Sequence, residues 1–362
     1  MNKTNFMLLM VVVLLACIGL IMVYSASSAY AMDRFGSSYY FFHRQLLWLF
    51  IGGMGLIFTY NLPYKKWKAA SKPLIIVSIL LLLMTISPLG HQAGGAKRWI
   101  GFGGFLLQPA EIAKLFFVIY IAEFLSRKKV KVKSFWQGLF PPLLVLIVFV
   151  GILLLQPDFG TAVLIAVLTF ILFFVGGGSL IYLLSLFSLS LPIAYYLVFN
   201  VGYRRERVMT ILNPYKDPQG AGFQLIQSII AIGSGRIFGK GIGASKQKLF
   251  FLPSSYNDFI FSIIAEESGF IGATIIILLF VVFVILGFRI VLKAREAKDD
   301  FAVLLALGII LLISIQAFIN IGVSTGILPT KGLCLPFVSY GGSSLAVNLT
   351  SVGILLNIGK SH

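Results

Sequence analysis

The chain has 362 residues, of which 59% are hydrophobic and only 11% are charged. This composition excludes an ordinary soluble domain and predicts a helical protein that crosses a bilayer several times. The formal net charge is +17, but most basic residues flank apolar runs, so membrane orientation and anionic lipid explain the charge better than nucleic acid does.

Apolar runs recur along the whole chain, and each is taken as one membrane-spanning helix. The first begins after Lys3 and is followed by Ala29-Tyr30-Ala31, an arrangement that also occurs in signal peptides. Its apolar stretch exceeds the roughly 7–15 residues of a signal peptide, so we expect a retained helix. The ten runs cover residues 6–27, 44–61, 73–88, 108–126, 138–156, 161–177, 179–200, 259–291, 301–324 and 340–358.

Basic residues predict how these helices are oriented in the membrane. With a cytoplasmic N-terminus, the short inner loops at 65–72, 127–133 and 289–298 are rich in Lys and Arg, whereas the short outer loops carry few. This bias predicts that both termini lie in the cytoplasm (N-in/C-in). We therefore expect an all-α integral membrane protein of about ten transmembrane helices, with residues 1–362 forming a single polytopic domain.

One long hydrophilic loop, 201–258, separates the seventh and eighth helices and falls on the extracytoplasmic side. Long loops cross the membrane regardless of their charge. Within this loop, residues 223–232 predict a short helix that lies on the membrane surface. The eighth apolar run is too long for one simple span, so its first part, with Glu266 and Glu267, is expected to belong to the loop or to lie deep in a cavity.

Cysteine and histidine are too few to suggest a disulfide or a metal site. Cys17 lies within the first apolar run and Cys334 lies in a late loop, so the two thiols are not expected to meet. His43, His91 and His362 are scattered through the chain, which argues against zinc.

Asp258 is the strongest candidate for chemistry. Acidic residues are scarce, with 12 Asp and Glu in the chain, and this one stands where the long polar loop gives way to the eighth apolar run. An ionisable residue at the mouth of a membrane helix is a functional candidate. The alternative is that Asp258 caps the N-terminus of the following helix, a role that Asp often takes.

A polar stripe opens the fourth helix. Gln108, Glu111 and Lys114 follow one another at intervals of three residues, which places them on one face of a helix. Glu111 can pair with Lys114 along that face. Because charges within a membrane are costly, the stripe should face a cavity rather than lipid. A buried ion pair that joins two helices is the alternative.

Further polar residues lie near the predicted outer ends of the helices. Asp158 follows the fifth helix, where it could bind a ligand or cap the sixth helix. Arg98 lies in an outer loop, where it could anchor the chain at the interface or bind a lipid phosphate. Pro and Gly break the backbone between 326 and 344, which is tolerated only inside protein or around a cavity. Lys331 is the sole charge of this segment, which also contains Ser339.

Together these residues favour glycosyl transfer from a diphosphate. The outer side carries one strong carboxylate, Asp258, and several cations, but no His or Cys nucleophile. A glycosidase normally needs two carboxylates. A diphosphate leaves without a general acid, so one base for the attacking hydroxyl and a few cations for the phosphates suffice. The cations are Arg98, Lys114, Lys331 and the arginines of the long loop.

Several short motifs follow one another along the chain: Lys97-Arg-Trp-Ile100, Gln108-Pro109 with Glu111 and Lys114, Gln156-Pro-Asp-Phe-Gly-Thr161, Asn213-Pro-Tyr-Lys-Asp-Pro218, Gln247-Lys-Leu-Phe-Phe-Leu-Pro253, Asn257-Asp-Phe-Ile-Phe261 and Ser339-Tyr-Gly-Gly-Ser-Ser344. In this order and at these membrane positions they resemble the SEDS family (shape, elongation, division and sporulation) of ten-helix bacterial membrane proteins. The Pro329-Thr-Lys-Gly332 variant is similar to the FtsW-type, division branch. Five positions depart from the usual family pattern: Ala110, where Ser is common; Arg236, where Gly is frequent; Ser254, where Glu often follows Leu-Pro; and Asn257 and Cys334, where Thr is frequent.

The resemblance implies a peptidoglycan glycosyltransferase that polymerises lipid II into glycan strands during cell division, with release of undecaprenyl diphosphate. A divalent cation, Mg²⁺ or Mn²⁺, could sit at the diphosphate, and no organic cofactor is implied. The implied partners are a class B penicillin-binding transpeptidase (FtsI-type) and other divisome proteins. The chain would lie among membrane lipids in the bacterial cytoplasmic (inner) membrane at the division septum. Asp258 would be the catalytic carboxylate, and the residues implied around the substrate cavity are Arg98, Gln108, Glu111, Lys114, Asp158, Lys331 and Ser339.

Two other functions fit a polytopic helical bundle. One is a lipid II flippase, but a transporter should carry charge along its whole path, including the inner half. In this chain the notable polar residues cluster at the outer edge. The other is a non-catalytic divisome scaffold, which would tolerate the loss of Asp258.

Overall fold

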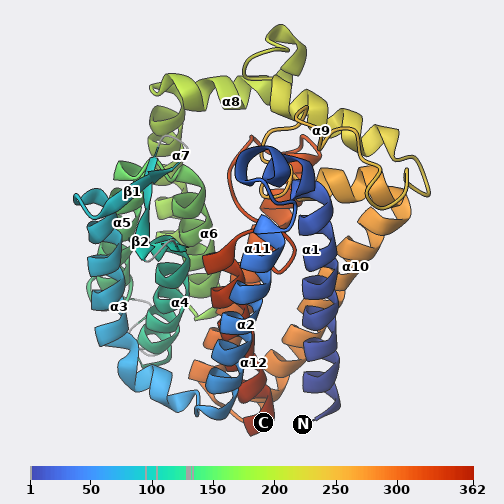
Figure 1. Cartoon of the computed structure of the whole chain (residues 1–362). Coiled ribbons are helices and arrows are strands. Elements are labelled where there is room, and N and C mark those ends of the chain that lie inside the picture. The colour runs from blue at the N-terminus through green and yellow to red at the C-terminus, as the bar shows by residue number, and fades with distance from the viewer. Residues whose placement is uncertain (1, 94–95, 103–104, 128–131, 133) are drawn as a thin grey trace.

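The computed structural model describes residues 2–93, 96–102, 105–127, 132 and 134–362. Gly94 and Gly95 lie outside the described residues, as do Lys128, Lys129, Lys131 and Lys133 of the basic loop. In the described part, ten helices correspond to the ten predicted segments and stand side by side in a bundle (Figure 1). They are α1 (Lys3–Phe35), α2 (Tyr40–Asn61), α3 (Lys65–Ile86), α4 (Pro109–Arg127), α5 (Phe140–Leu155), α6 (Phe159–Val175), α7 (Leu180–Phe199), α10 (Ile260–Glu296), α11 (Asp300–Ser324) and α12 (Gly342–Ser361).

Eight helices are long and apolar enough to cross a membrane by length and composition, and the search covers only the described residues. The two bundle helices outside this set are α4, which carries several charged side chains, and α6, which has 17 residues. Both are packed inside the bundle, since α4 lies against α3 and α11 and α6 lies against α5 and α11. The chain is therefore a multi-pass membrane protein, as predicted.

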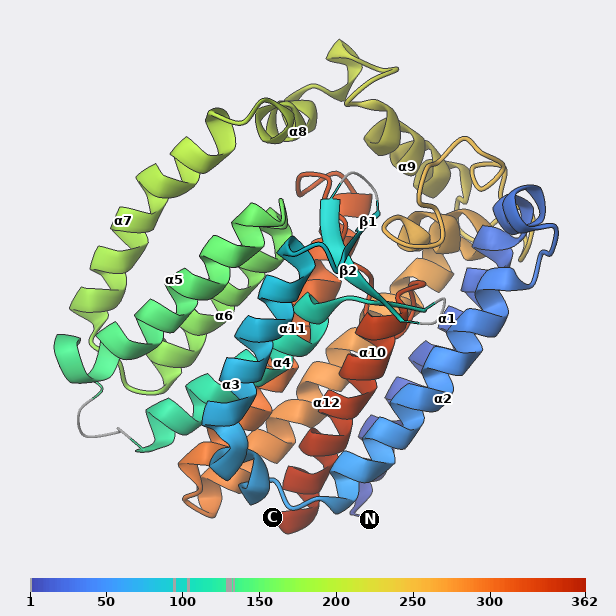
Figure 2. The same ribbon diagram turned by 60° about the vertical axis from the view of Figure 1, so that its left-hand side comes forward.

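The centre of the bundle is formed by α11 and α12. In their most apolar stretches, 67% of the α11 residues and 78% of the α12 residues are buried, against 6% for α7. Only Leu183 is buried among the residues of α7, and Figure 2 shows α7 at the edge of the bundle. Large apolar side chains are exposed along α2, α3, α5, α7 and α10, which is the pattern expected of helices that face lipid.

Both chain termini lie at one end of the bundle, and the long loop lies at the other (Figure 1). The side-chain amide of Asn2 donates to the Gly359 carbonyl at 2.6 Å, and that of Asn5 donates to the Leu356 carbonyl at 2.8 Å. The long loop contains α8 (Gly202–Leu212), the short helical turn η2 (Pro214–Lys216) and α9 (Phe223–Ser234). The helix predicted at 223–232 is thus present, and the termini share one side as predicted.

A small antiparallel sheet lies between α3 and α4, where only a loop was expected. It consists of β1 (Gly90–Ala93), β2 (Ala96–Phe102) and β3 (Phe105–Leu107), in the order β1-β2-β3. Ile100 in the middle strand pairs with Gly90 on one side and with Leu107 on the other. Strands this short give little periodic signal in a sequence. The sheet places Arg98 on its central strand, and a π-helical turn, η1 (Phe135–Leu139), precedes α5.

The eighth segment is one helix broken once. Gly269 has φ 68° and ψ −167°, which interrupts the helical path of α10. Loop residues 236–241 cross the break, where the Phe270 amide donates to the Arg236 carbonyl at 2.8 Å and the Lys240 amide donates to the Glu266 carbonyl at 3.0 Å. Glu266 and Glu267 therefore lie in the helical part before the break and are covered by the loop, rather than belonging to the loop or lining a cavity.

Candidate functional site

Asp258 lies two residues before α10, at the end of the bundle opposite the termini. The N-cap of α10 is Phe259, and no side chain caps this helix. The structure therefore does not support a capping role for Asp258. Among the described residues, no side chain or amide forms a hydrogen bond with its carboxylate, which is partly buried. The carboxylate is thus left available for a ligand.

The backbone at Asp258 is held by a side chain from α11. The Asn320 amide donates to the Asp258 carbonyl at 2.9 Å and to the Leu333 carbonyl at 2.7 Å. A Cβ atom added to Gly332 would lie 3.2 Å from Oδ2 of Asp258, so a larger residue at this position would press on the carboxylate. The broken segment 326–344 therefore forms one wall of the site.

Ser339 holds the segment 326–344 in place and does not line an open cavity. Its hydroxyl donates to the Asn257 carbonyl at 2.6 Å and accepts from the Leu335 amide at 2.8 Å, and the residue is buried. The Cys334 thiol donates to Oδ1 of Asn257 at 2.8 Å. Asn257 and Cys334, two of the positions that depart from the family pattern, are thus in direct contact.

The surroundings of Asp258 favour a carboxyl group that can act as a base near neutral pH. Burial raises the pKa of Asp258 to about 7, while the nearby guanidinium groups of Arg207 and Arg98 act in the opposite direction. An exposed Asp has a pKa of about 3.9 and is a weak base. A carboxylate with a higher pKa accepts a proton more readily, and the neighbouring cations keep part of it ionised.

A cluster of cations surrounds the N-terminal end of α6. The guanidinium of Arg204 lies 5.2 Å from the centre of the Phe159 ring, and Nζ of Lys331 lies 4.6 Å from it. Arg207 donates to the Thr330 carbonyl at 3.0 Å, and Arg98 donates to the Gln156 carbonyl at 3.0 Å. Such a cluster, in which cations outnumber the carboxylates beside them, suits an anionic ligand.

Within this cluster, Lys331 has an unusual environment. Burial lowers the pKa of Lys331 to about 8, and Arg207 and Arg204 add to this effect, whereas Asp158 opposes it. Asp158 itself caps α6: its carboxylate accepts from the Thr161 amide at 3.3 Å and from the Thr161 hydroxyl at 2.8 Å. The structure thus shows the capping role that the sequence left open.

Glu111 and Lys114 form a buried ion pair behind this wall. Nζ of Lys114 lies 2.8 Å from Glu111 Oε1 and donates to Gln316 Oε1 at 2.8 Å. The Gln316 amide in turn donates to the Cys334 carbonyl at 3.0 Å. The pair faces the interior of the bundle and connects α4 to α11 and, through Gln316, to the broken segment 326–344. Gln108 lies at the outer start of the same stripe, where its backbone amide donates to the Ser343 hydroxyl at 2.9 Å.

Several residues of the site were not identified individually from the sequence, which named the arginines of the long loop only as a group. Arg204 and Arg207 belong to a run of charges in the long loop, and their spacing on α8 places both on one face, with Arg205 directed away. Gln316 and Asn320 are two amides four residues apart in a run that is otherwise apolar except for two serines. That pattern was a usable signal, because polar side chains inside a membrane segment generally have a partner.

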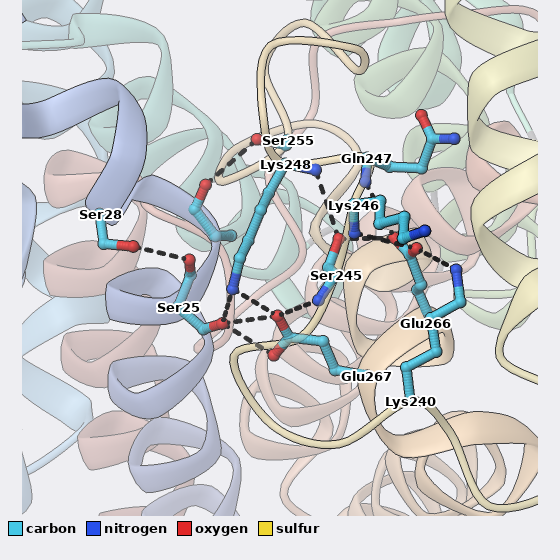
Figure 3. A network of polar contacts seen from close by, with 11 residues as sticks. Ser25, Ser28, Lys240, Ser245, Lys246, Gln247, Lys248, Ser255, Glu266 and Glu267 are labelled. Carbon is cyan, nitrogen blue, oxygen red and sulfur yellow. Dashed lines mark hydrogen bonds and ion pairs between the residues drawn. The ribbon is translucent and has the colours of Figure 1, made fainter. Parts of the chain in front are cut away.

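A second buried polar cluster joins the long loop to α1 and α10 (Figure 3). Glu267 accepts from the Ser25 hydroxyl at 2.7 Å and from Nζ of Lys248 at 2.8 Å. Glu266 accepts from Nζ of Lys240 at 2.7 Å and from the Ser245 hydroxyl at 2.5 Å. These contacts fix the loop that leads to Asp258, so the cluster supports the site without belonging to it.

Comparison with known proteins identifies the family of the chain. Residues 5–362 match the model of the FTSW_RODA_SPOVE family, described as cell cycle proteins. The chain is 44% identical, over 358 residues, to the probable peptidoglycan glycosyltransferase FtsW of Geobacter metallireducens, covering 99% of this chain and 95% of that protein. It is 42% identical, over 360 residues, to the stage V sporulation protein E of Bacillus subtilis, covering 99% and 98%.

Solved structures show the same fold. A chain from a peptidoglycan synthase complex, solved in work on the structural coordination of polymerization and crosslinking, superposes with a TM-score of 0.80 at 30% identity and covers 98% of this chain and 97% of that one. The rod shape determining protein RodA of Thermus thermophilus superposes with a TM-score of 0.72 at 26% identity, covering 98% and 96%.

Proposed function

This chain belongs to the FtsW, RodA and SpoVE family of cell cycle proteins, and on that basis we propose that it is a peptidoglycan glycosyltransferase of cell division that polymerises lipid II. The observation that supports this most directly is the partly buried carboxylate of Asp258, which has no hydrogen-bond partner among the described residues and lies near Arg98 and Arg207. One base among several cations is the minimum that sugar transfer from a diphosphate requires.

In the proposed reaction, Asp258 takes the proton from the 4-hydroxyl of the GlcNAc of one lipid II molecule. The hydroxyl oxygen forms a bond to C1 of the MurNAc at the end of the growing glycan, with inversion. The bond between C1 and the diphosphate oxygen breaks, and undecaprenyl diphosphate leaves with the electron pair. The pKa of about 7 for Asp258 suits this role, because the carboxylate is then a stronger base than an exposed Asp.

The cations would hold the leaving group. Arg98, Arg207 and Lys331 lie on the same side of the bundle as Asp258, and each adds positive charge where the departing diphosphate gains negative charge. The segment 326–344 would be kept in place by Glu111, Lys114 and Ser339, which would support the site without contacting the substrate. Asp158 would keep Lys331 and the start of α6 in place.

A Mg²⁺ or Mn²⁺ ion at the diphosphate is part of the proposal. Mg²⁺ in phosphate chemistry is commonly bound by one or two carboxylates together with the substrate phosphates. In the described part of the chain, no group of three or more His, Cys, Asp or Glu residues could hold a metal ion. The residues therefore fit an ion held chiefly by the substrate, which would neutralise phosphate charge there.

The proposed partner is a class B penicillin-binding transpeptidase, together with other divisome proteins, at the septum in the cytoplasmic membrane. Support comes from the similar chain that was solved as part of a peptidoglycan synthase complex. Because a transpeptidase crosslinks the strands that a polymerase makes, pairing the two activities in one complex would deliver new glycan directly to the crosslinking site.

The test is to supply purified lipid II to the purified protein in detergent, alone and with a co-purified transpeptidase. We expect glycan strands to form with the partner present. A proteoliposome assay under the same conditions separates the proposal from transport. If lipid II crossed the bilayer while no polymer formed, the flippase would replace the polymerase as the function.

Replacing Arg207 with Gln should weaken the reaction more than the same change at Arg205. Arg207 is close enough to Asp258 to influence its pKa, whereas Arg205 points away on the same helix. We expect kcat/KM for lipid II to fall by about tenfold or more in Arg207→Gln and to stay within about twofold in Arg205→Gln. Initial polymerisation rates over a range of lipid II concentrations measure both. Equal losses in the two variants would contradict a specific role for Arg207.

A further inference from the structure

A basic pocket lies between α3 and α4, at the end of the bundle that holds the termini. Its volume is about 420 Å³. The turn before α3 contacts residues at that end of the bundle. The Tyr64 hydroxyl donates to Oδ2 of Asp299 at 2.6 Å and lies 3.3 Å from Nε2 of His362, near the C-terminus. The pocket is therefore far from Asp258 and has no part in the proposed reaction. Its polar lining consists of Lys65, Lys68, Ser71, Lys72, Glu123 and Arg127.

The charges of this pocket form an ordered array. Lys65, Lys68 and Lys72 lie on one face of the first two turns of α3, because they are spaced by three and four residues. Arg127 lies in the last turn of α4, and its guanidinium is held by Glu123 at 3.0 Å. The pocket is thus lined by four cations and by one carboxylate, that of Glu123, which is already paired with Arg127. The net charge of the lining is therefore strongly positive.

One buried polar atom in the pocket lacks a partner among the described residues. Glu123 is 7% exposed, and its Oε2 atom has no hydrogen-bond partner in the described part of the chain. Buried polar groups generally form hydrogen bonds, so a carboxylate acceptor left over at this site indicates a ligand that offers a donor. Ser71 is 2% exposed and also lines the pocket, where its hydroxyl can donate to the same ligand.

An apolar stripe continues from the lysines toward the membrane centre. Ile76 and Leu80 follow Lys72 at intervals of four residues on α3, so they extend the same helix face. Their side chains are 57% and 55% exposed. A cationic head region followed by an exposed apolar stripe matches a phospholipid, whose phosphate would meet the lysines while an acyl chain lies along the helix. A soluble phosphate compound would make no use of the stripe.

We propose that this pocket binds the headgroup of an anionic phospholipid with a hydroxylated headgroup, of which phosphatidylglycerol is the simplest. The lysines and Arg127 hold the phosphate, Ser71 donates to a phosphate oxygen, and a headgroup hydroxyl donates to Glu123. Basic pockets between transmembrane helices on the cytoplasmic side are a known means of binding such headgroups.

The test compares two triple variants of the full chain that remove the same charge from the same end. One is Lys65→Gln, Lys68→Gln and Lys72→Gln in the pocket; the control is Arg289→Gln, Lys293→Gln and Arg295→Gln on α10, whose side chains do not line it. Each protein is equilibrated with vesicles of phosphatidylglycerol and phosphatidylcholine, and retained lipid is counted by native mass spectrometry. We expect the pocket variant to retain phosphatidylglycerol at least about tenfold more weakly than the wild type, with the control unchanged.

Two further arms address the site and the source of the phosphate. Ser71→Ala changes no charge, so a fall of a few-fold in phosphatidylglycerol retention supports a built site, whereas an unchanged value points to general charge attraction and contradicts it. Inorganic phosphate is added as a competitor to the wild type. Its failure to displace the lipid supports the proposal. Displacement by phosphate, or equal lipid loss in the two triple variants, would overturn it.

Discussion

Replacing Asp258 with Asn is expected to abolish glycan synthesis, with a loss of at least about 100-fold in rate, because the amide cannot accept the proton of the attacking hydroxyl. The substitution preserves the shape of the side chain. No described residue forms a hydrogen bond with the carboxylate, and the Asn320 contact uses the main chain, so the fold should persist. Lipid II polymerisation with the transpeptidase partner measures the effect, and co-purification of the partner shows that the variant is folded.

Asp33→Asn is the matched control, since Asp33 is an exposed acid near the outer end of α1. This variant should polymerise at the wild-type rate. Glycan strands of normal amount and length from Asp258→Asn would remove Asp258 from the mechanism and favour a scaffold.

The pH profile gives an independent view of the same residue. Burial raises the pKa of Asp258 to about 7, and the base works only in its ionised form. Therefore kcat/KM should rise as the pH increases through about 7 and level off above it. Arg207→Gln removes a cation that lowers this pKa, so its profile should move to higher pH. A flat profile across neutral pH would argue against Asp258 as the titrating base.

Replacing Glu267 with Gln should cause the largest loss of stability. Glu267 and Lys248 are both buried, and their side chains meet at 2.8 Å beneath the long loop (Figure 3). Gln cannot balance the charge of the buried ammonium, and removing one partner of a buried pair typically costs about 3–5 kcal/mol. Thermal unfolding of the purified protein in detergent measures the change.

A second substitution distinguishes charge from shape at this position. In the double variant Glu267→Gln with Lys248→Met, no unpaired charge remains, so much of the lost stability should return. Lys240→Gln gives the comparison for an ion pair that is partly exposed, because the Lys240 side chain is 31% exposed, and its effect should be smaller. A double variant as unstable as Glu267→Gln would show that the unpaired ammonium is not the cause.

The helices were predictable because the length of an apolar run is a local property of the chain. A run near 20 residues fits the bilayer in any fold, so the ten segments correspond to ten helices with shifts at their ends. The position of Asp258 just before a membrane helix was also predictable, because the boundary between a polar loop and an apolar run is visible in the sequence. The break at Gly269 was foreseen only as excess length, since its position depends on the loop that crosses it.

The architecture around Asp258 was less predictable, because it depends on contacts between distant segments. Asn320 and Asp258 are 62 residues apart, and Ser339 and Asn257 are 82 apart. The sequence presented Ser339 as a cavity residue, whereas its hydroxyl is used to join two loops. Arg204 and Arg207 could be separated from Arg205 only after α8 was known to be a helix. Role and orientation therefore required the three-dimensional structure, whereas the presence of polar residues did not.

The low burial of α7 has a thermodynamic consequence for how the enzyme would bind its substrate. Helix α7 buries little of its surface and leads directly into α8, the segment that carries Arg204 and Arg207. An anion bound by those guanidinium groups would be expected to restrain the helix before them, and by reciprocity a restrained α7 would bind that anion more strongly. A lipid-linked sugar bound there would then help to hold this peripheral helix in place.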